Sequence, residues 1–188
     1  LNLSNKNELT VLHLAAEKGN LEMLMFILEN DGNWRANINA TNYVNWTALH
    51  MAVFDKHFDV VRALIDRGAD LNILDNDGWS ILHIAVDQGH QEIVEELLKS
   101  GIARGLKIDN KDVEGWTSLH FAAFKGNNKI LAELISHGSN INELTNDDWT
   151  ALHIAAQENM IDSVRVLTDQ RRASSIINAK NFEGYAAT

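Results

Sequence analysis

Paired runs of apolar residues recur along this chain at helical spacing. In one unit, residues 118–125 (SLHFAAFK) supply small and apolar side chains for a helix of about two turns. The run that follows places its apolar side chains on one stripe of a second helix: Ile130, Leu131, Leu134 and Ile135. The alanines at 122 and 123 let the two helices approach closely. Each unit is therefore predicted to be a pair of packed helices.

The pairs repeat with a nearly fixed period. A Thr/Ser-x-Leu-His tetrad ends at histidines 13, 50, 83, 120 and 153, which are 37, 33, 37 and 33 residues apart. Periods of 20 to 50 residues are typical of solenoids. The longer spacings come from four extra residues after the second run of the first and third units, and three extra follow in the fifth unit. We expect these insertions, one of which contains Trp34, to lengthen loops or outer helices.

Local signals mark where each element starts and stops. Thr117 and Thr150 can accept hydrogen bonds from the free amides of a helix start. Gly126 can end the short helix by taking a left-handed conformation. Segments rich in Asn, Asp and Gly, such as DNDG at 75–78, have the composition of turns. The chain is thus expected to alternate helix pairs with turn-rich connectors.

These units resemble ankyrin repeats. The segment DNDGWSILHIAVDQGHQEIVEELLKSG matches the family pattern almost continuously, RGADLN at 67–72 matches its tail, and the likeness covers about residues 5–184. The resemblance implies an all-α ankyrin repeat solenoid of helix-turn-helix units with hairpin-type connectors. We predict a single array over residues 1–188, with repeats at 5–41, 42–74, 75–111, 112–144 and 145–180 and the start of a sixth at 181–188.

One departure from the family pattern affects rigidity. The proline that follows the capping threonine in ankyrin repeats is absent, and the chain has no proline at all. Proline at the first helical position fixes φ in advance, so its loss is expected to give a less rigid array.

Charge and composition exclude several classes of partner. The 16 Lys and Arg residues against 26 Asp and Glu give a net charge of -10, which opposes binding to nucleic acid or to an anionic membrane. No apolar run approaches the roughly 20 residues of a membrane-spanning helix. There is no cysteine, and hence no thiolate nucleophile, disulfide or zinc-ribbon site.

Seven of the eight histidines are predicted to be structural, and no role is assigned to His137 at the end of a helix. Five of the eight belong to the tetrads, one in each unit, and at about 10 Å between packed helices they are too far apart to share a metal ion. His57 and His90 occupy the position after the first helix that is structural in the family. No phosphate-binding glycine loop, nucleophile motif or metalloprotease motif occurs. We therefore predict no metal, no cofactor and no catalysis.

In proteins that resemble this one, partners bind on a concave side formed by the turn tips and the exposed face of the short helices. The positions that match this side are acidic and aromatic. The residues expected to bind a partner are Tyr43, Trp46, Phe54, Asp77, Trp79, Asp87, Glu114, Trp116, Phe124 and Trp149. Exposed aromatic clusters are typical of binding hot spots. The acidic character favours a partner protein that offers a basic segment with apolar anchors.

A structural role for the tryptophans is the competing interpretation. A tryptophan before the capping threonine is common in the family, where its ring can cover the turn and the cap. Phe54 and Phe124 discriminate better, because an exposed phenylalanine on the short helix is hard to explain by stability. The pairing of each with the tryptophan of its own repeat is the feature that favours binding.

The sequence thus predicts a protein-protein interaction scaffold that acts as a monomer. Two other hypotheses stay open: a regulatory or targeting arm of a larger enzyme, toxin or channel, and a host-directed effector of an intracellular microbe. Either fits an expected cytoplasmic location, in the producing cell or in a host. We also expect a piece of a longer protein, because the chain begins with Leu1 and ends at Thr188 before the helices of a sixth unit.

Overall fold

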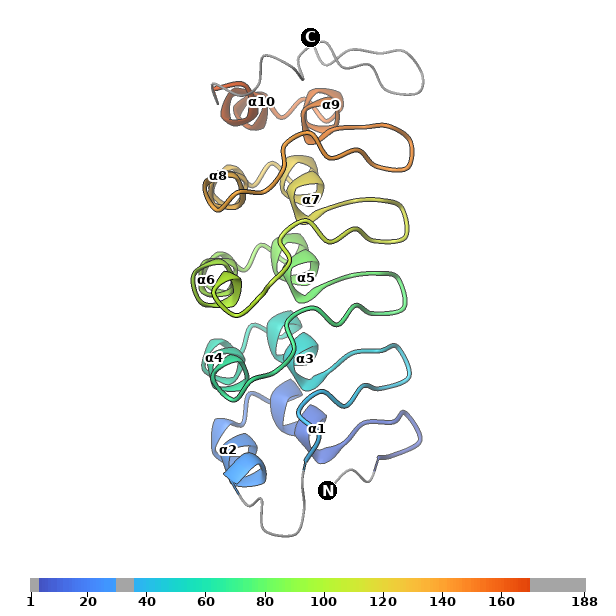
Figure 1. Cartoon of the computed structure of the whole chain (residues 1–188), viewed down its shortest axis with the longest axis vertical. Helices are drawn as coiled ribbons and strands as arrows, with labels where there is room; N and C mark the ends of the chain where they lie inside the picture. The colour runs from blue at the N-terminus through green and yellow to red at the C-terminus, as the bar shows by residue number, and fades with distance from the viewer. Residues whose placement is uncertain (1–3, 30–35, 170–188) are drawn as a thin grey trace. The chain divides into compact units, whose positions relative to one another are not determined.

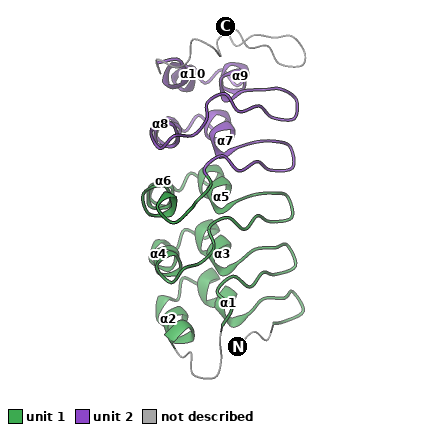
Figure 2. Cartoon of the chain, viewed as in Figure 1, with its two compact units in different colours: residues 1–107 green, residues 108–188 purple. Residues whose placement is uncertain are grey.

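The computed structural model describes residues 4–29 and 36–169. The start of the sixth repeat, Trp34 and most of the first insertion lie outside these ranges. The chain divides into two compact units, residues 1–107 and 108–188, which Figure 2 distinguishes by colour. Each unit is described by itself.

The first unit holds three helix pairs. They are α1 (Val11–Glu17) with α2 (Leu21–Glu29), α3 (Ala48–Phe54) with α4 (Phe58–Asp66), and α5 (Ile81–Asp87) with α6 (Gln91–Glu96). Helix α6 continues into the π-helical segment η1 (Leu97–Gly101). Within this unit, α1, α3 and α5 form a row beside the hairpin-type connectors, and α2, α4 and α6 form the outer row (Figure 1).

The second unit repeats the arrangement. It pairs α7 (Ser118–Phe124) with α8 (Asn128–Ser136), and α9 (Ala151–Gln157) with α10 (Ile161–Thr168). Apart from an isolated bridge between Ser4 and Thr10, the residues that the structure covers form no strand. The predicted all-α architecture of helix pairs and hairpin-type connectors is confirmed.

The short helices start as predicted, with a reciprocal cap. Thr150 Oγ1 accepts a hydrogen bond from the His153 amide at 3.3 Å, and the Thr150 amide donates to His153 Nδ1 at 3.2 Å. The same exchange caps α1, α3 and α5. Because two otherwise free amides are satisfied at once, the histidine does the work of the Glu or Gln in an ordinary capping box. This cap fixes the first turn without the missing proline.

Small side chains bring the two rows of helices together. Ala52, Ala85 and Ala122 are fully buried where the short helices face the outer ones. The outer helices contribute fully buried aliphatic side chains, such as Val61 and Leu131, to the same core. Close packing of this kind makes the core intolerant of changes in volume.

The third-repeat insertion extends the outer helix, which is one of the two outcomes that the spacing allows. Its extra residues widen the end of α6 into η1, where Leu97 and Leu98 are buried. The chain then turns back, so that Arg104 bonds the carbonyl of Ile65 and forms an ion pair of 3.0 Å with Asp66. The insertion is therefore packed against α4.

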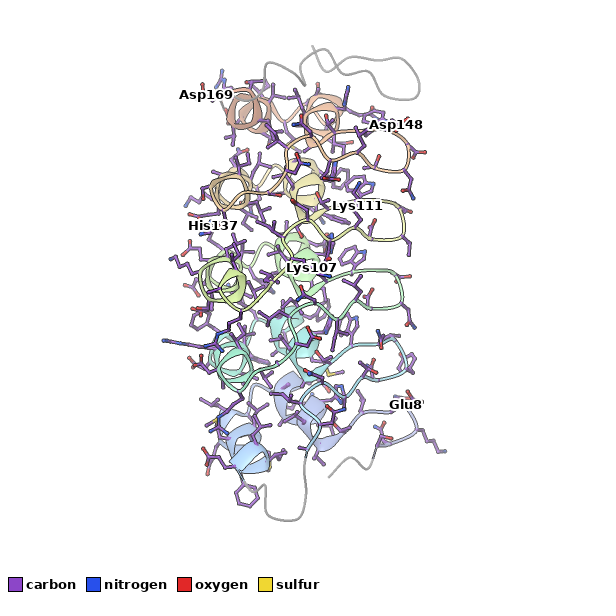
Figure 3. All side chains as sticks on the ribbon, viewed as in Figure 1. Glu8, Lys107, Lys111, His137, Asp148 and Asp169 are labelled. Carbon is purple, nitrogen blue, oxygen red and sulfur yellow. The ribbon has the colours of Figure 1, made fainter. Side chains whose placement is uncertain are left out.

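The connectors turn through left-handed residues just before each tryptophan. Gly78 and Gly115 take this position with φ of 79°. Asp148 takes it with φ of 62°, and Glu8 takes the equivalent position before Leu9 with φ of 59°; Figure 3 labels both at connector tips. Glycine adopts this region without steric cost, whereas other residues are strained there.

Gly115 is expected to be the least replaceable turn glycine of the second unit. A Cβ atom at 115 would lie 2.6 Å from Asn146 Oδ1 and 2.7 Å from the Asn146 amide nitrogen, whereas one at Gly138 would meet nothing within 4 Å. Both positions have positive φ, so Gly138→Ala is a matched control for backbone strain alone. Gly115→Ala should lower the free energy of unfolding by about 1–3 kcal/mol more than Gly138→Ala. Urea denaturation measures this, and equal losses would contradict the close approach of the two connectors.

Candidate protein-binding surface

The four tryptophans before the helix caps occupy equivalent, half-buried positions. Each ring lies beside the capping histidine of its own repeat, with ring centroids 6.1–6.3 Å apart. Each backbone amide is held by the side chain four residues earlier: Asn42, Asp75, Asp112 and Thr145. The tryptophan rings thus lie beside the caps, and the tryptophans are partly structural.

Phe54 and Phe124 pack against the tryptophans of their own repeats. The ring centroids of Trp46 and Phe54 are 5.3 Å apart, and those of Trp116 and Phe124 are 5.8 Å apart with the rings nearly perpendicular. Both phenylalanines nevertheless stay 40–44% exposed. The predicted pairing is thus a direct contact, and it leaves an aromatic surface open to solvent.

Phe121 also contacts the pair formed by Trp116 and Phe124, but it is absent from the residues predicted to bind a partner. The ring centroid of Phe121 lies 5.0 Å from that of Trp116. Residues three apart on a helix share a face, so the spacing of Phe121 and Phe124 carried this information.

The acidic members of the predicted set lie on the turn tips and at the end of a short helix. Asp77 and Glu114 are exposed, and their amides bond Asp75 and Asp112 within the turn. Asp87 ends α5 and is half-buried. Tyr43, also on a turn tip, is 63% exposed. Asp77, Glu114 and Tyr43 thus lie on connectors, and Asp87 lies at the end of a short helix.

The two units divide the predicted residues. The first unit contains Tyr43, Trp46, Phe54, Asp77, Trp79 and Asp87, and the second contains Glu114, Trp116, Phe124 and Trp149. In the second unit three of these four line one open pocket of about 200 Å³: Trp116, Phe124 and Trp149. Asp147 and Glu158 line the same pocket.

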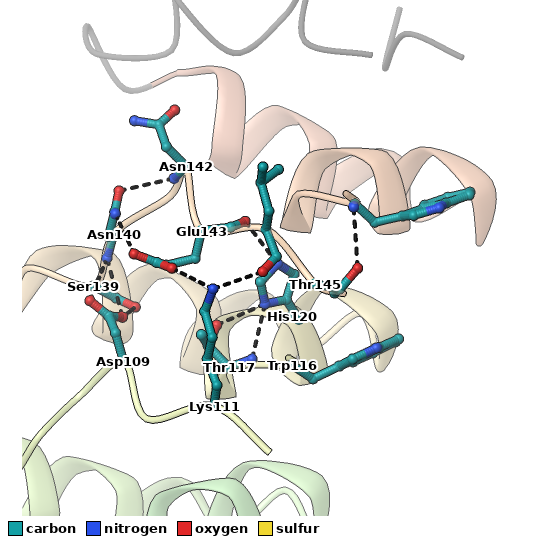
Figure 4. A network of polar contacts seen from close by, with 12 residues as sticks. Asp109, Lys111, Trp116, Thr117, His120, Ser139, Asn140, Asn142, Glu143 and Thr145 are labelled. Atoms are coloured by element: carbon teal, nitrogen blue, oxygen red, sulfur yellow. Dashed lines mark hydrogen bonds and ion pairs between the residues drawn. The ribbon is translucent and has the colours of Figure 1, made fainter. Parts of the chain in front are cut away.

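A polar network joins consecutive connectors of the second unit (Figure 4). Lys111 Nζ forms a 2.8 Å ion pair with Glu143 and donates a hydrogen bond of 2.8 Å to the Leu144 carbonyl. The hydrogen bond from Lys111 to the Glu143 carboxylate is the main cause of the lowered pKa of that carboxyl. Asp109 accepts a hydrogen bond from Ser139. These bonds fix the register of the connectors that carry Trp116 and Trp149.

The capping histidines also join one repeat to the next. His13 Nε2 donates to the Trp46 carbonyl at 3.0 Å, and His120 Nε2 donates to the Glu143 carbonyl at 3.1 Å. Since Nδ1 accepts from the cap amide, each ring must be neutral with its proton on Nε2. His57 and His90 likewise bond the carbonyls of Glu17 and Phe54 in the preceding repeats. The predicted structural role of these histidines is confirmed.

Burial keeps two of the capping histidines neutral. It lowers the pKa of His50 to about 4, and the Asp75 carboxylate and Ile73 carbonyl offset only part of the effect. Burial likewise lowers the pKa of His120 to about 4, against the opposing influence of the Glu143 and Trp149 carbonyls. These rings support the surface and are unsuited to proton transfer at neutral pH.

The surface of the turn tips and short helices is the strongest candidate for a functional site. The described part of the chain contains no group of three His, Asp or Glu side chains that could hold a metal ion. Within the same residues, no helix is long and apolar enough to cross a membrane. The aromatic pairs and the pocket of the second unit, by contrast, are open to solvent on the connector side.

Comparison with known proteins gives a consistent result. The family model "Ankyrin repeats (3 copies)" matches residues 1–75, 35–107 and 102–181. A Notch-regulated ankyrin repeat-containing protein from Xenopus tropicalis is 41% identical over 67 residues, which are 36% of this chain and 59% of that protein. The human protein of the same name is 42% identical over 63 residues, 34% of this chain and 55% of its own length. The chain thus spans a little over half the length of these relatives.

The neutral histidines predict a loss of stability in mild acid. The pKa of His120 is about 4 in the folded chain and about 6.5 in an unfolded one, so the unfolded state binds more protons between these values. The contribution is complete above pH 6.5 and is lost as the pH falls towards 4, by up to about 3 kcal/mol. Urea denaturation from pH 7 to pH 4 should give a shallower pH dependence for His120→Gln than for the wild type. Identical slopes would contradict a neutral, buried His120.

Proposed function

Because the chain belongs to the ankyrin repeat family, we propose that it is a non-catalytic scaffold that binds a partner protein on the concave face of its turn tips and short helices. Ankyrin repeats are generally protein-protein interaction modules. The observation that carries the proposal is the pair of aromatic contacts, Trp46 with Phe54 and Trp116 with Phe124, in which the phenylalanines remain 40–44% exposed. Burial in a partner would remove this apolar area from water.

The connector and the helix cap hold each aromatic pair in place, which favours binding. Each tryptophan amide is fixed by a side chain of its own connector, and each ring rests beside a capping histidine. A preformed aromatic surface loses little conformational entropy when a partner docks. Aromatic anchors of this kind supply most of the binding free energy in many interfaces.

The acidic charge of the chain favours a basic partner. Asp77 and Glu114 are exposed on the turn tips, and the whole chain carries a net charge of -10. Complementary potentials accelerate encounter and reject partners of like charge. We therefore propose a basic segment of a protein, with apolar side chains that dock on the aromatic pairs.

Selection from a random peptide display library tests the proposal with no partner specified in advance. Peptides retained by the chain should be enriched in Lys or Arg together with aromatic or aliphatic residues. Against one such peptide, Phe54→Ala, Trp79→Ala, Trp116→Ala and Phe124→Ala should each lower affinity at least fivefold, by about 1 kcal/mol or more. Phe26→Ala is the matched control, because Phe26 is 63% exposed on the outer helix α2. Unchanged affinity in all four variants would overturn the proposed face.

The electrostatic part of the proposal has its own test. The association rate of the selected peptide should fall as ionic strength rises, because salt screens exposed charges. Asp77→Asn and Glu114→Gln should lower that rate at low salt. Asp59→Asn on the outer helix α4 removes an equally exposed charge from the opposite row and should have a smaller effect. Rates that are independent of salt and of all three variants would contradict a basic partner.

A further inference from the structure

The pocket of the second unit is suited to one cationic side chain. Its volume of about 200 Å³ is smaller than the roughly 300–1,000 Å³ of sites for drug-sized ligands. It is open to solvent on the connector side of α7 and α9, where the candidate surface lies. The pocket therefore has the size to hold a single side chain that projects from a docked segment.

The aromatic part of the lining comes from two consecutive repeats. Trp116 and Phe124 belong to the repeat of α7, and Trp149 belongs to the repeat of α9. Trp116 and Trp149 directly precede the capping threonines of α7 and α9, so they reach the pocket from successive connectors. The faces of aromatic rings carry a negative potential that attracts cations, with tryptophan the strongest of the three types.

The polar part of the lining is anionic. Asp147 lies on the turn tip before Trp149, and Glu158 follows the end of α9. Both residues are exposed, and neither forms an ion pair with another of the described side chains. Their charges are therefore available to an incoming cation. Lys125, which follows Phe124, does not line the pocket.

A substitution within the repeat accounts for the pocket. In the first unit the indole of Trp46 donates a hydrogen bond of 3.0 Å to the Asp75 carboxylate of the next connector. The residue equivalent to Asp75 one repeat after Trp116 is Thr145. Thr145 has a shorter side chain, accepts a hydrogen bond from the Trp149 amide, and lines the pocket. Position 145 thus carries no carboxylate, and the carboxylates that line the pocket belong to Asp147 and Glu158.

We propose that this pocket binds the side chain of an arginine in the partner segment. The inference rests on the proposed function and names the residue type that its second-unit surface recognises. The planar guanidinium stacks on the tryptophan rings while its five N–H donors reach the carboxylates of Asp147 and Glu158. Lysine has a compact, strongly hydrated charge and cannot stack in this way.

Nuclear magnetic resonance of the whole ¹⁵N-labelled chain tests the assignment through its indole N–H signals. The probe is the blocked peptide acetyl-Gly-Arg-Gly-amide, compared with peptides that carry lysine, trimethyllysine or citrulline in the central position. The arginine peptide should shift the signals of Trp116 and Trp149 in a saturable manner. Trp46 and Trp79 of the first unit are internal controls and should shift less. The citrulline peptide, which has nearly the same shape without the charge, should bind at least tenfold more weakly.

Substitutions distinguish the contribution of the pocket carboxylates from that of other surface charges. The double substitution Asp147→Asn with Glu158→Gln should weaken the arginine peptide at least tenfold. Asp162→Asn removes an exposed charge from the outer helix α10 and should leave the affinity unchanged. Equal binding of arginine and citrulline, tighter binding of trimethyllysine, or equal shifts of all the tryptophans would each overturn the arginine assignment.

The same design distinguishes this inference from the proposed function. A selected peptide that loses affinity with Phe124→Ala but keeps it when its arginines are replaced by citrulline would refute the arginine pocket alone. An arginine probe that binds at Trp116 and Trp149, with no selected peptide sensitive to the aromatic variants, would refute the wider binding face and leave the pocket intact.

Discussion

Capping histidines such as His13 and His120 bond in two directions, and the helix pairs depend on them. In the second unit, His120 Nδ1 accepts from the Thr117 amide at 3.0 Å while Nε2 donates to the Glu143 carbonyl at 3.1 Å. One neutral ring thus starts its own helix and holds the next connector. A charged ring could not accept from the cap amide, and burial makes the charged form unfavourable in any case. Because an unsatisfied buried polar group costs about 1–3 kcal/mol, losing this ring would weaken both the helix start and the link between repeats.

The aromatic surface follows from the cap. Each tryptophan lies beside a capping histidine with its amide fixed by the connector, so its position is set before any partner arrives. One part of the ring covers the cap, and the rest contributes to the exposed side. The structural and binding interpretations of these tryptophans are therefore compatible, because indole is large enough and amphipathic enough to serve both. Phe54 and Phe124 extend the aromatic area from the edge of the indole towards solvent.

Features carried by local pattern could be predicted from the sequence. The period located the helix pairs, Thr150 and its equivalents located the helix starts, and Gly126 marked the end of a short helix with φ of 66°. The contact between Trp116 and Phe124 followed from their positions within one repeat. Features that depend on two repeats at once could not be predicted in this way. The bond from Trp46 to Asp75 and the close approach of Gly115 to Asn146 each join residues about thirty positions apart, where only the packed backbone sets the distance. The π-helical form of η1 was likewise hidden, since an insertion of given length can widen a helix or lengthen a loop.

The residue four positions before each tryptophan affects both the stability of the turn and the specificity of partner binding. In its own repeat it holds the tryptophan amide, a task that Asn42, Asp75, Asp112 and Thr145 all perform. Asp75 also accepts a hydrogen bond from the indole of the preceding repeat, so that one carboxylate serves two repeats. Threonine at 145 keeps the first task and has no carboxylate for the second. The turn keeps its hydrogen bond to the tryptophan amide with either side chain, so the residue at this position can change without loss of the fold. Binding specificity in such an array can therefore change through a residue whose main role is to stabilise the turn. Such a residue is hard to recognise when only the exposed positions are considered.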